Sequence, residues 1–326
     1  MHRRSFSLAA GLITTAVGCS IASLPARAAF PDKPVTIVVS DQAGGPADVI
    51  ARTLGQQLSA SLKQPVIVEN RPGAYTTLGL AQVAKAKPDG YTLGIMFMPH
   101  TVLSTLYKGT PYDVRKSFTP ISKAADLFNA LVVNKDVPVK SVADLVSHIR
   151  SKPGQINFGS GGTGTPAHLS GELLKRQAGL DMQHIPFKGP ADALNNVIGG
   201  RVDLMFLSLP VAMPMVQSGK LNALAVTSDR AAPAAPHLPT MTQSGFRDFV
   251  VLDWMGVVGP AGMPADLVAL LNGEVAKAVA SSELRDRLKP LGIEPTSSTA
   301  AEFSALIDRE VGKWEQFTKQ LGVSLD

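Results

Sequence analysis

The strongest constraint in this chain is the regular alternation of short apolar runs with segments of helical periodicity. Strands are predicted at 34–40, 64–70, 88–96, 129–136, 155–158, 182–187, 202–206, 221–227 and 249–260. Between the first two of these strands, the segment 47–62 carries apolar residues at helical spacing. Strands that alternate with helices in this way predict an α/β fold whose parallel sheets are covered on both faces. The length of 326 residues favours two domains.

The first 28 residues have the pattern of a secretory signal peptide. Arg3 and Arg4 precede an apolar stretch, and Ala26-Arg27-Ala28 is a small-x-small cleavage site. The arginine pair also resembles a twin-arginine signal, so both the Sec and the twin-arginine routes stay open. The alternative is an N-terminal membrane anchor, for which the apolar run is short. We therefore expect export to the periplasm.

Cleavage after Ala28 would change both the charge and the thiol content of the chain. Three of the 31 basic residues and no acidic residue lie in the leader, which leaves 28 basic residues against 26 acidic ones. This nearly neutral balance argues against nucleic acid as a partner. The only cysteine, Cys19, also lies in the leader. The mature chain would then hold no disulfide and no cysteine-bound metal, although a lipoprotein cleavage box at 16–19 is a minor alternative.

Two glycine-rich loops each follow a predicted strand and lead into a predicted helix. The first contains Gly44 and Gly45, and the second adds hydroxyl groups from Ser160, Thr163 and Thr165. Helix N-termini carry unpaired N–H groups and the positive end of the helix dipole, and glycine lets a ligand approach the backbone. Because neither loop contains Lys or Arg, these donors suit a carboxylate better than a phosphate. The alternative is that both loops are merely tight connections.

Motifs for catalysis or for a cofactor are weak. Gly159, Gly161 and Gly164 match G-x-G-x-x-G, but the acidic residue that a dinucleotide site needs is misplaced, because Asp181 precedes the next strand. There is no Gly-Lys-Ser/Thr for a P-loop. The histidines have no metal-binding spacing. We therefore predict no catalytic residue, no cofactor and no metal.

Two side chains beside the loops could act in several ways. Asp48 could be a base, could complement the helix dipole, or could fix its loop by accepting backbone N–H bonds. His168 could contact an anion, or could simply cap the helix and pack. Ser160 does not lie in a G-x-S-x-G elbow, since position 158 is Phe.

The whole mature chain resembles a known family in a series of motifs that occur in the expected order. They include "VENRPGA" (68–74), "AKAKPDGYTL" (84–93), "GSGGTGTPAHLSGELLK" (159–175) and "GGRVDLMF" (199–206). The chain is similar to the extracytoplasmic solute receptors of tripartite tricarboxylate transporters, the TctC-like or Bug family. The resemblance implies a type II periplasmic-binding-protein fold, in which two α/β lobes hold the ligand between them. Residues 29–127 with 253–326 would form lobe 1 and residues 128–252 lobe 2, joined by crossovers near 128–133 and 251–256.

The resemblance also implies which residues contact the ligand, a small organic acid such as a dicarboxylate, a tricarboxylate or an aromatic carboxylate. The implied contacts are Ala43, Gly44, Gly45, Asp48, Ser160, Gly161, Gly162, Thr163, Gly164, Thr165, His168 and Ser208. The sequence departs from the family at 207–209, where Leu-Ser-Leu stands in place of an Asp-Asn start. We therefore expect a less polar distal end of the ligand. Its candidate walls are Met96, Met98, Phe128, Leu207 and Trp254, which could equally be core residues.

The resulting prediction is a periplasmic solute-binding protein that performs no chemistry. It would close around a carboxylate and present it to the membrane permease of a tripartite transporter, and family analogy favours a monomer. Two alternatives stay open: a secreted enzyme that uses the same cleft, and a sensor subunit that reports the ligand to a signalling system.

Overall fold

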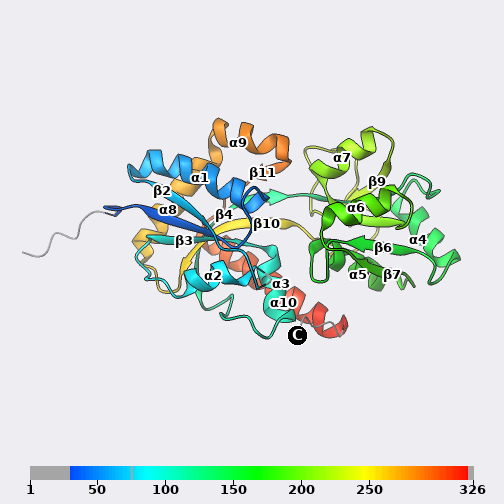
Figure 1. Cartoon of the computed structure of the whole chain (residues 1–326), viewed down its shortest axis with the longest axis horizontal. Helices are drawn as coiled ribbons and strands as arrows, with labels where there is room; N and C mark the ends of the chain where they lie inside the picture. Colours follow the sequence, from blue (N-terminus) through cyan, green and yellow to red (C-terminus); the bar gives the residue numbers. More distant parts are fainter. Residues whose placement is uncertain (1–29, 75, 322–326) are drawn as a thin grey trace, which may run out of the picture.

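The computed structural model describes residues 30–74 and 76–321, and these residues form two β-sheets that lie side by side (Figure 1). The first sheet has six strands: β1 (Val35–Val39), β2 (Val66–Asn70), β3 (Thr92–Phe97), β4 (Phe118–Leu127), β10 (Asp253–Pro260) and β11 (Ile293–Pro295). The second has five: β5 (Asn129–Asn134), β6 (Asn157–Ser160), β7 (Gln183–Pro186), β8 (Leu204–Ser208) and β9 (Leu221–Val226). The α/β fold class is confirmed.

Both sheets are mixed, so the expectation of parallel sheets holds for only part of each sheet. The first sheet has the order β11-β4-β10-β3-β1-β2, and β10 runs antiparallel to both β3 and β4. The second has the order β7-β6-β8-β5-β9, and β5 runs antiparallel to both β8 and β9. Strands β5 and β10 are those where the chain enters one sheet from the other, and β11 also runs antiparallel to β4. Strand direction depends on these long-range connections, which local periodicity does not report.

Helices cover both faces of the first sheet because its strands are apolar on both sides. In β1, Ile37 and Val39 pack with α1 (Pro46–Leu62), whereas Val38 faces the opposite core cluster. The other helices around this sheet are α2 (Thr77–Ala84), α3 (Met98–Leu106), α8 (Ala265–Ala280), α9 (Ser282–Leu288), the 3₁₀ helix η1 (Lys289–Leu291) and α10 (Ala300–Leu321). Continuous apolar strands of this kind are typical of sheets buried on both faces.

The second sheet is built in the same way. Leu131 and Val133 of β5 pack with α4 (Val142–Ser151) and α5 (Pro166–Ala178). On the other face, Ala130 and Val132 pack with residues of α6 (Pro190–Ile198) and α7 (Leu209–Gln217). The period of two along β5 therefore decides which helices each side chain contacts.

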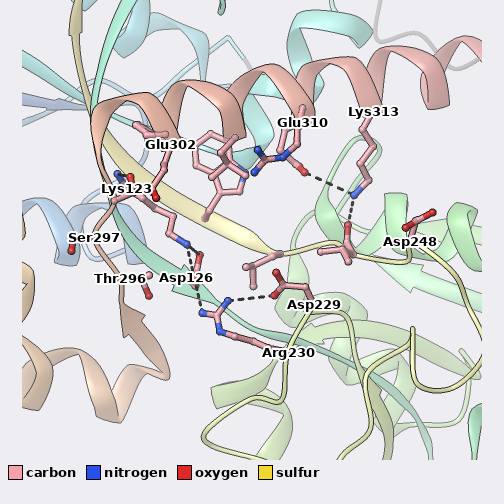
Figure 2. Close-up of a pocket in the computed structure, with 17 residues that line it drawn as sticks. Lys123, Asp126, Asp229, Arg230, Asp248, Thr296, Ser297, Glu302, Glu310 and Lys313 are labelled. Atoms are coloured by element: carbon pink, nitrogen blue, oxygen red, sulfur yellow. Dashed lines mark hydrogen bonds and ion pairs between the residues drawn. The ribbon is translucent and has the colours of Figure 1, made fainter.

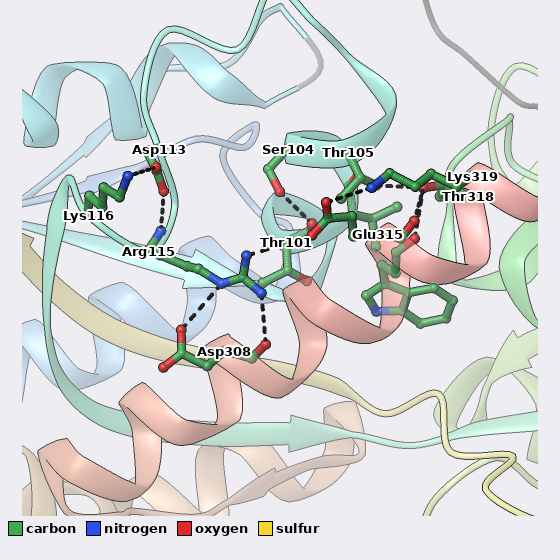
Figure 3. Close-up of polar contacts among 12 residues, drawn as sticks. Thr101, Ser104, Thr105, Asp113, Arg115, Lys116, Asp308, Glu315, Thr318 and Lys319 are labelled. Atoms are coloured by element: carbon green, nitrogen blue, oxygen red, sulfur yellow. Dashed lines mark hydrogen bonds and ion pairs between the residues drawn. The ribbon is translucent and has the colours of Figure 1, made fainter.

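The long helix α10 contacts several segments that are distant in the sequence. Its N-terminus is capped, since Glu302 donates its backbone N–H to Thr299 Oγ1 at 3.2 Å and accepts from the Thr299 backbone at 2.9 Å. Arg115 contacts Asp308 at 3.5 Å and Glu315 at 3.8 Å on this helix (Figure 3). Lys313 Nζ, further along the helix, donates to the carbonyl of Val250, just before β10.

Two groups of predictions stay open. The predicted leader, residues 1–28, lies outside the described residues. The lobe boundaries at 127/128 and 252/253 also stay a prediction. Among residues 30–74 and 76–321, no helix combines the length and the apolar character that a bilayer span requires.

Candidate functional site

The carboxyl ends of β1, β3 and β4 in the first sheet, and of β6 and β8 in the second, point toward the other sheet. Strand β4 runs in the same direction as β3, since both are antiparallel to β10, and it leads through Phe128 directly into β5. The first residue of β5, Asn129, pairs with Ser208 at the end of β8, which is parallel to β6. The loops that follow β1 and β6 therefore face the space between the sheets (Figure 1). Ligands of open α/β sheets bind at such carboxyl ends.

Among the described residues, five of the α-helices that follow such strand ends have proline at their first or second position. They are α1, α3, α5, α6 and α7, with Pro46, Pro99, Pro166, Pro190 and Pro210. Proline fits the start of a helix, where its missing N–H is not needed. Each N-terminus adds a partial positive charge to the space between the sheets. Together they make this space favourable for an anion.

The first loop, at 40–45, is held in place by Asp48. The backbone N–H of Gly44 donates to Asp48 Oδ2 at 2.8 Å, in a loop conformation where Gly44 has φ +87°. Arg52 in turn contacts both oxygens of Asp48, each at 3.0 Å. Burial would raise the pKa of Asp48, but the hydrogen bonds from Arg52 and Gly44 outweigh it and lower this pKa. Asp48 is thus an ionised, buried acceptor, as one of the predicted alternatives proposes.

The second loop, at 161–165, is held by three side chains. Ser160 Oγ donates to the carbonyl of Gly162 at 3.0 Å and accepts the N–H of the same residue at 3.1 Å. Thr165 Oγ1 donates to that carbonyl at 2.7 Å and caps α5 by accepting the N–H of His168 at 3.4 Å. The backbone N–H of Gly164 donates to His168 Nδ1 at 3.1 Å. Several predicted site residues therefore bond to one another.

Not every amide of the two loops is used in this way. Within the part of the chain that the structure describes, no hydrogen bond uses the backbone N–H of Ala43, Gly161 or Thr163. Ala43 and Thr163 are exposed, and Gly161 is half-buried. These three N–H groups are open to a ligand, whereas those of Gly44 and Gly164 are already donated.

Two histidines pack beneath the second loop, and the sequence indicated only one of them. His168 and His184 have ring centroids 4.2 Å apart, and His184 Nε2 lies 2.7 Å from Ser160 Oγ. Burial lowers the pKa of each histidine to about 4, and Lys175 adds to the effect on both. Both rings are therefore neutral near pH 7.

The contact between Ser160 and His184 is not a catalytic dyad. The Ser160 hydroxyl is fully buried and already donates its proton to Gly162. The same oxygen lies 2.7 Å from His184 Nε2, but because Ser160 is fully buried, a substrate cannot reach it. Among the described residues, no group of His, Cys, Asp and Glu could hold a metal ion.

The remaining predicted residues lie in different places. Ser208 ends β8 and precedes α7, at the same edge as the loops. Met96, Met98 and Trp254 belong to the largest core cluster, and Phe128 and Leu207 to another. Their role as walls of a ligand site stays a prediction.

A charged cavity of about 650 Å³ lies where the two crossovers meet α10 (Figure 2). Asp126 of β4 is fully buried and binds Lys123 at 2.9 Å and Arg230 at 2.8 Å. Trp254 also lines the cavity, and its Nε1 has no hydrogen-bond partner among residues 30–74 and 76–321. Neither of the two predicted loops contributes a residue to the lining of this cavity. Sequence reasoning missed the Asp126–Arg230 pair, because its members are 104 positions apart.

A second cavity, of about 530 Å³, lies between η1, β11 and the start of α7. Phe128 and Leu209 form part of its apolar wall, and Arg285 and Lys289 also line it. Of the predicted wall residues, Phe128 thus lines this cavity and Trp254 the charged one.

Comparison with known proteins gives a consistent result. A family model described as "Tripartite tricarboxylate transporter family receptor" matches residues 50–323. The structure is similar to that of the periplasmic binding protein BugD, with 34% identity and a TM-score of 0.73, covering 90% of this chain and 99% of BugD. It is also similar to R. palustris Rpa4515 with adipate, with 33% identity and a TM-score of 0.76, over 90% and 99% of the two chains. A third similar structure is MatC (Rpa3494) from Rhodopseudomonas palustris with bound malate, with 31% identity and a TM-score of 0.71, over 88% and 99%.

Proposed function

Since the chain belongs to the tripartite tricarboxylate transporter receptor family, we propose that it captures a small organic acid between the loops at 40–48 and 160–168. The family is one of solute-binding receptors with a periplasmic-binding-protein fold, and the protein is not an enzyme. The acid is handed to the membrane permease of a tripartite transporter. The observation that carries the proposal is that both loops end at helix N-termini and face the space between the sheets.

A carboxylate fits this pair of loops better than a phosphate does. Arg52, a cation beside the first loop, is already bound by Asp48 and by Asn70 Oδ1, the latter at 2.8 Å. The open groups are neutral backbone donors, at Ala43 on one side and at Gly161 and Thr163 on the other. Adipate and malate, the acids in two of the similar structures, carry the same carboxylate groups. In the proposed site, Gly44 and Gly164 allow close approach of the ligand but donate their N–H groups elsewhere.

The distal end of the ligand meets a less polar surface than in a receptor with an acidic residue there. Leu207 is buried and Ser208 is half-buried at the end of β8. With no charged group at these positions, the proposed ligand class includes acids with an apolar or aromatic body.

Capture requires the two lobes, residues 29–127 with 253–326 and residues 128–252, to close on the acid. The anion contacts donors of both loops only when the lobes meet, so it favours the closed form. In this proposal the protein is exported by the Sec or the twin-arginine route, loses residues 1–28, and acts as a monomer in the periplasm.

A thermal-shift panel tests the proposal. The purified protein is mixed with malate, adipate, benzoate, phosphate and dimethyl adipate. A ligand that binds only the folded state raises the melting temperature. We expect at least one of the three carboxylates to do so, and neither phosphate nor the uncharged diester. Stabilisation by the diester alone, or by phosphate alone, would overturn the proposal. If malate and adipate stabilise the protein and benzoate does not, the inferred apolar distal end is wrong.

A further inference from the structure

The two ligand loops carry the same five-residue arrangement in the two halves of the molecule. The first reads Gly-Gly-Pro-Ala-Asp at 44–48, and the second Gly-Thr-Pro-Ala-His at 164–168. In each, proline is the first residue of a helix, and Asp48 or His168 is the third residue of that helix. The arrangement therefore places Asp48 and His168 at equivalent positions of α1 and α5.

The hydrogen bond is also the same in the two loops. Gly44 donates its backbone N–H to Asp48 at 2.8 Å, and Gly164 donates its backbone N–H to His168 Nδ1 at 3.1 Å. Asp48 and His168 are each only 3% exposed. Both glycines have a positive φ, +87° and +83°, so each loop turns sharply where the bond holds it. The acceptor is what fixes the turn that presents the neighbouring open amides.

The two acceptors differ in charge, and their neighbours one helical turn further on differ with them. Asp48 is followed four residues later by Arg52, which neutralises it. His168 is followed four residues later by Glu172, which lies 3.8 Å from Lys175. A carboxylate at position 168 would thus have no arginine at the equivalent place. A neutral imidazole can accept the Gly164 N–H without adding negative charge beside an anionic ligand.

The hydrogen bond from Gly164 fixes the position of the proton on the His168 ring. His168 Nδ1 accepts from Gly164, so it carries no proton, and the proton of the neutral ring lies on Nε2. Ser160 Oγ lies 2.7 Å from His184 Nε2, so His184 holds Ser160 in place whichever of the two groups donates the proton. The two rings are 4.2 Å apart, which opposes charge on both at once.

We infer that His168 is the positioning residue of the second ligand loop, a neutral counterpart of Asp48 whose Nδ1 holds Gly164 in the shape that receives the acid. His184 supports it by fixing Ser160 at the end of β6. The inference rests on the proposed function, because the loop it shapes is the proposed carboxylate site.

The first test is a set of substitutions at one position. Adipate and malate are titrated into the wild type and into His168→Asn, His168→Asp, His168→Leu and the exposed control His237→Asn, at pH 7.5. Asparagine keeps an acceptor near Nδ1, aspartate keeps it but adds charge, and leucine removes it. We expect losses in affinity of about threefold for Asn and at least about tenfold for Asp and for Leu, in line with the loss of one buried hydrogen bond. Melting temperatures of all variants show whether each one is folded.

The second test needs no ligand and therefore separates this inference from the proposed function. Nitrogen-15 NMR of the histidine rings in the wild type, free of ligand, should show an unprotonated Nδ1 and a protonated Nε2 for His168. If neither acid binds the wild type, the proposed function loses its support, and the NMR result still decides whether His168 is the acceptor. A protonated Nδ1, a folded His168→Leu variant that binds like the wild type, or an Asn variant as weak as Leu would each overturn the inference.

Discussion

Arg230 donates to the carboxylate of Asp126 at 2.8 Å and so connects the loop after β9 with β4 of the other sheet. Asp126 is fully buried, whereas the Arg230 side chain is 44% exposed. Lys123 completes the contact from within β4 at 2.9 Å. The pair lies beside the charged cavity, next to the segment where the chain passes between the sheets (Figure 2).

Removal of the buried member of this pair is expected to cost more stability than removal of the exposed one. Asp126→Asn leaves the nearly buried ammonium of Lys123 without its counter-ion, so we expect the free energy of unfolding to fall by about 3 kcal/mol. Arg230→Gln removes a half-exposed charge and should cost at most about 1 kcal/mol. Urea unfolding of both variants measures the difference. Equal losses, or a larger loss for Arg230→Gln, would contradict this account of the pair.

Asp253, the first residue of β10, should make the free energy of unfolding depend on pH. Burial raises its pKa from 3.8 to about 7, so the folded protein keeps a proton that the unfolded chain has already lost. The contribution of the protonated Asp253 carboxyl to the free energy of unfolding is therefore fully present below about pH 4. It is lost as the pH rises toward 7. Asp253→Asn should raise the free energy of unfolding at pH 8 by about 1–3 kcal/mol and change it little at pH 4. Urea unfolding at the two pH values checks this, and an equal effect at both would show that the carboxyl does not titrate as stated.

Substitutions at two glycines within helices provide a matched test of core packing. A Cβ at Gly171 in α5 would overlap the ring of Phe158, whereas a Cβ at Gly273 in α8 would meet nothing within 4 Å. Gly171→Ala should therefore destabilise the protein by about 1–3 kcal/mol through overpacking. Gly273→Ala should stabilise it by up to about 1 kcal/mol, since alanine favours the helix. The sign of the change in thermal unfolding is decisive, and stabilisation by Gly171→Ala would mean that this contact is looser than described.

Substitution of Thr165 tests whether the second loop contributes to ligand binding. Thr165→Val removes the hydroxyl that donates to Gly162 and caps α5, and loss of such a cap costs about 1 kcal/mol. Thr165→Ser keeps the hydroxyl and is the control. We expect Val to lower both the melting temperature and the affinity for the bound acid, measured by calorimetry, and Ser to change both much less. Unchanged affinity in the Val variant would remove this hydroxyl from the proposed site.

Features that depend on neighbouring residues could be predicted from the sequence. The glycine loops, the helix over 47–62 and the cap formed by Thr299 and Glu302 all follow from residues a few positions apart. Each is a local match between residue type and backbone geometry. The α/β class follows because it depends on the alternation of such local segments.

Features that depend on distant pairing could not be predicted in this way. Strand β4 was not predicted, and the reversed directions of β5 and β10 follow only from how the chain passes between the sheets. His184 and Arg230 have no local pattern, because their partners Ser160 and Asp126 lie on other strands. The local sequence left several roles open for Asp48 and His168, and only the structure shows that they accept the N–H groups of Gly44 and Gly164.

The measurement that tests the central claim most directly is hydrogen–deuterium exchange with and without the acid that most stabilises the protein in the thermal-shift panel. The account predicts slower exchange in both loops, at 41–48 and at 160–168. The slowing should depend on the concentration of the acid in the same way in both loops. Slower exchange in only one of these loops, or only around the charged cavity at Asp126 and Arg230, would contradict the proposal that one carboxylate is held from both sides.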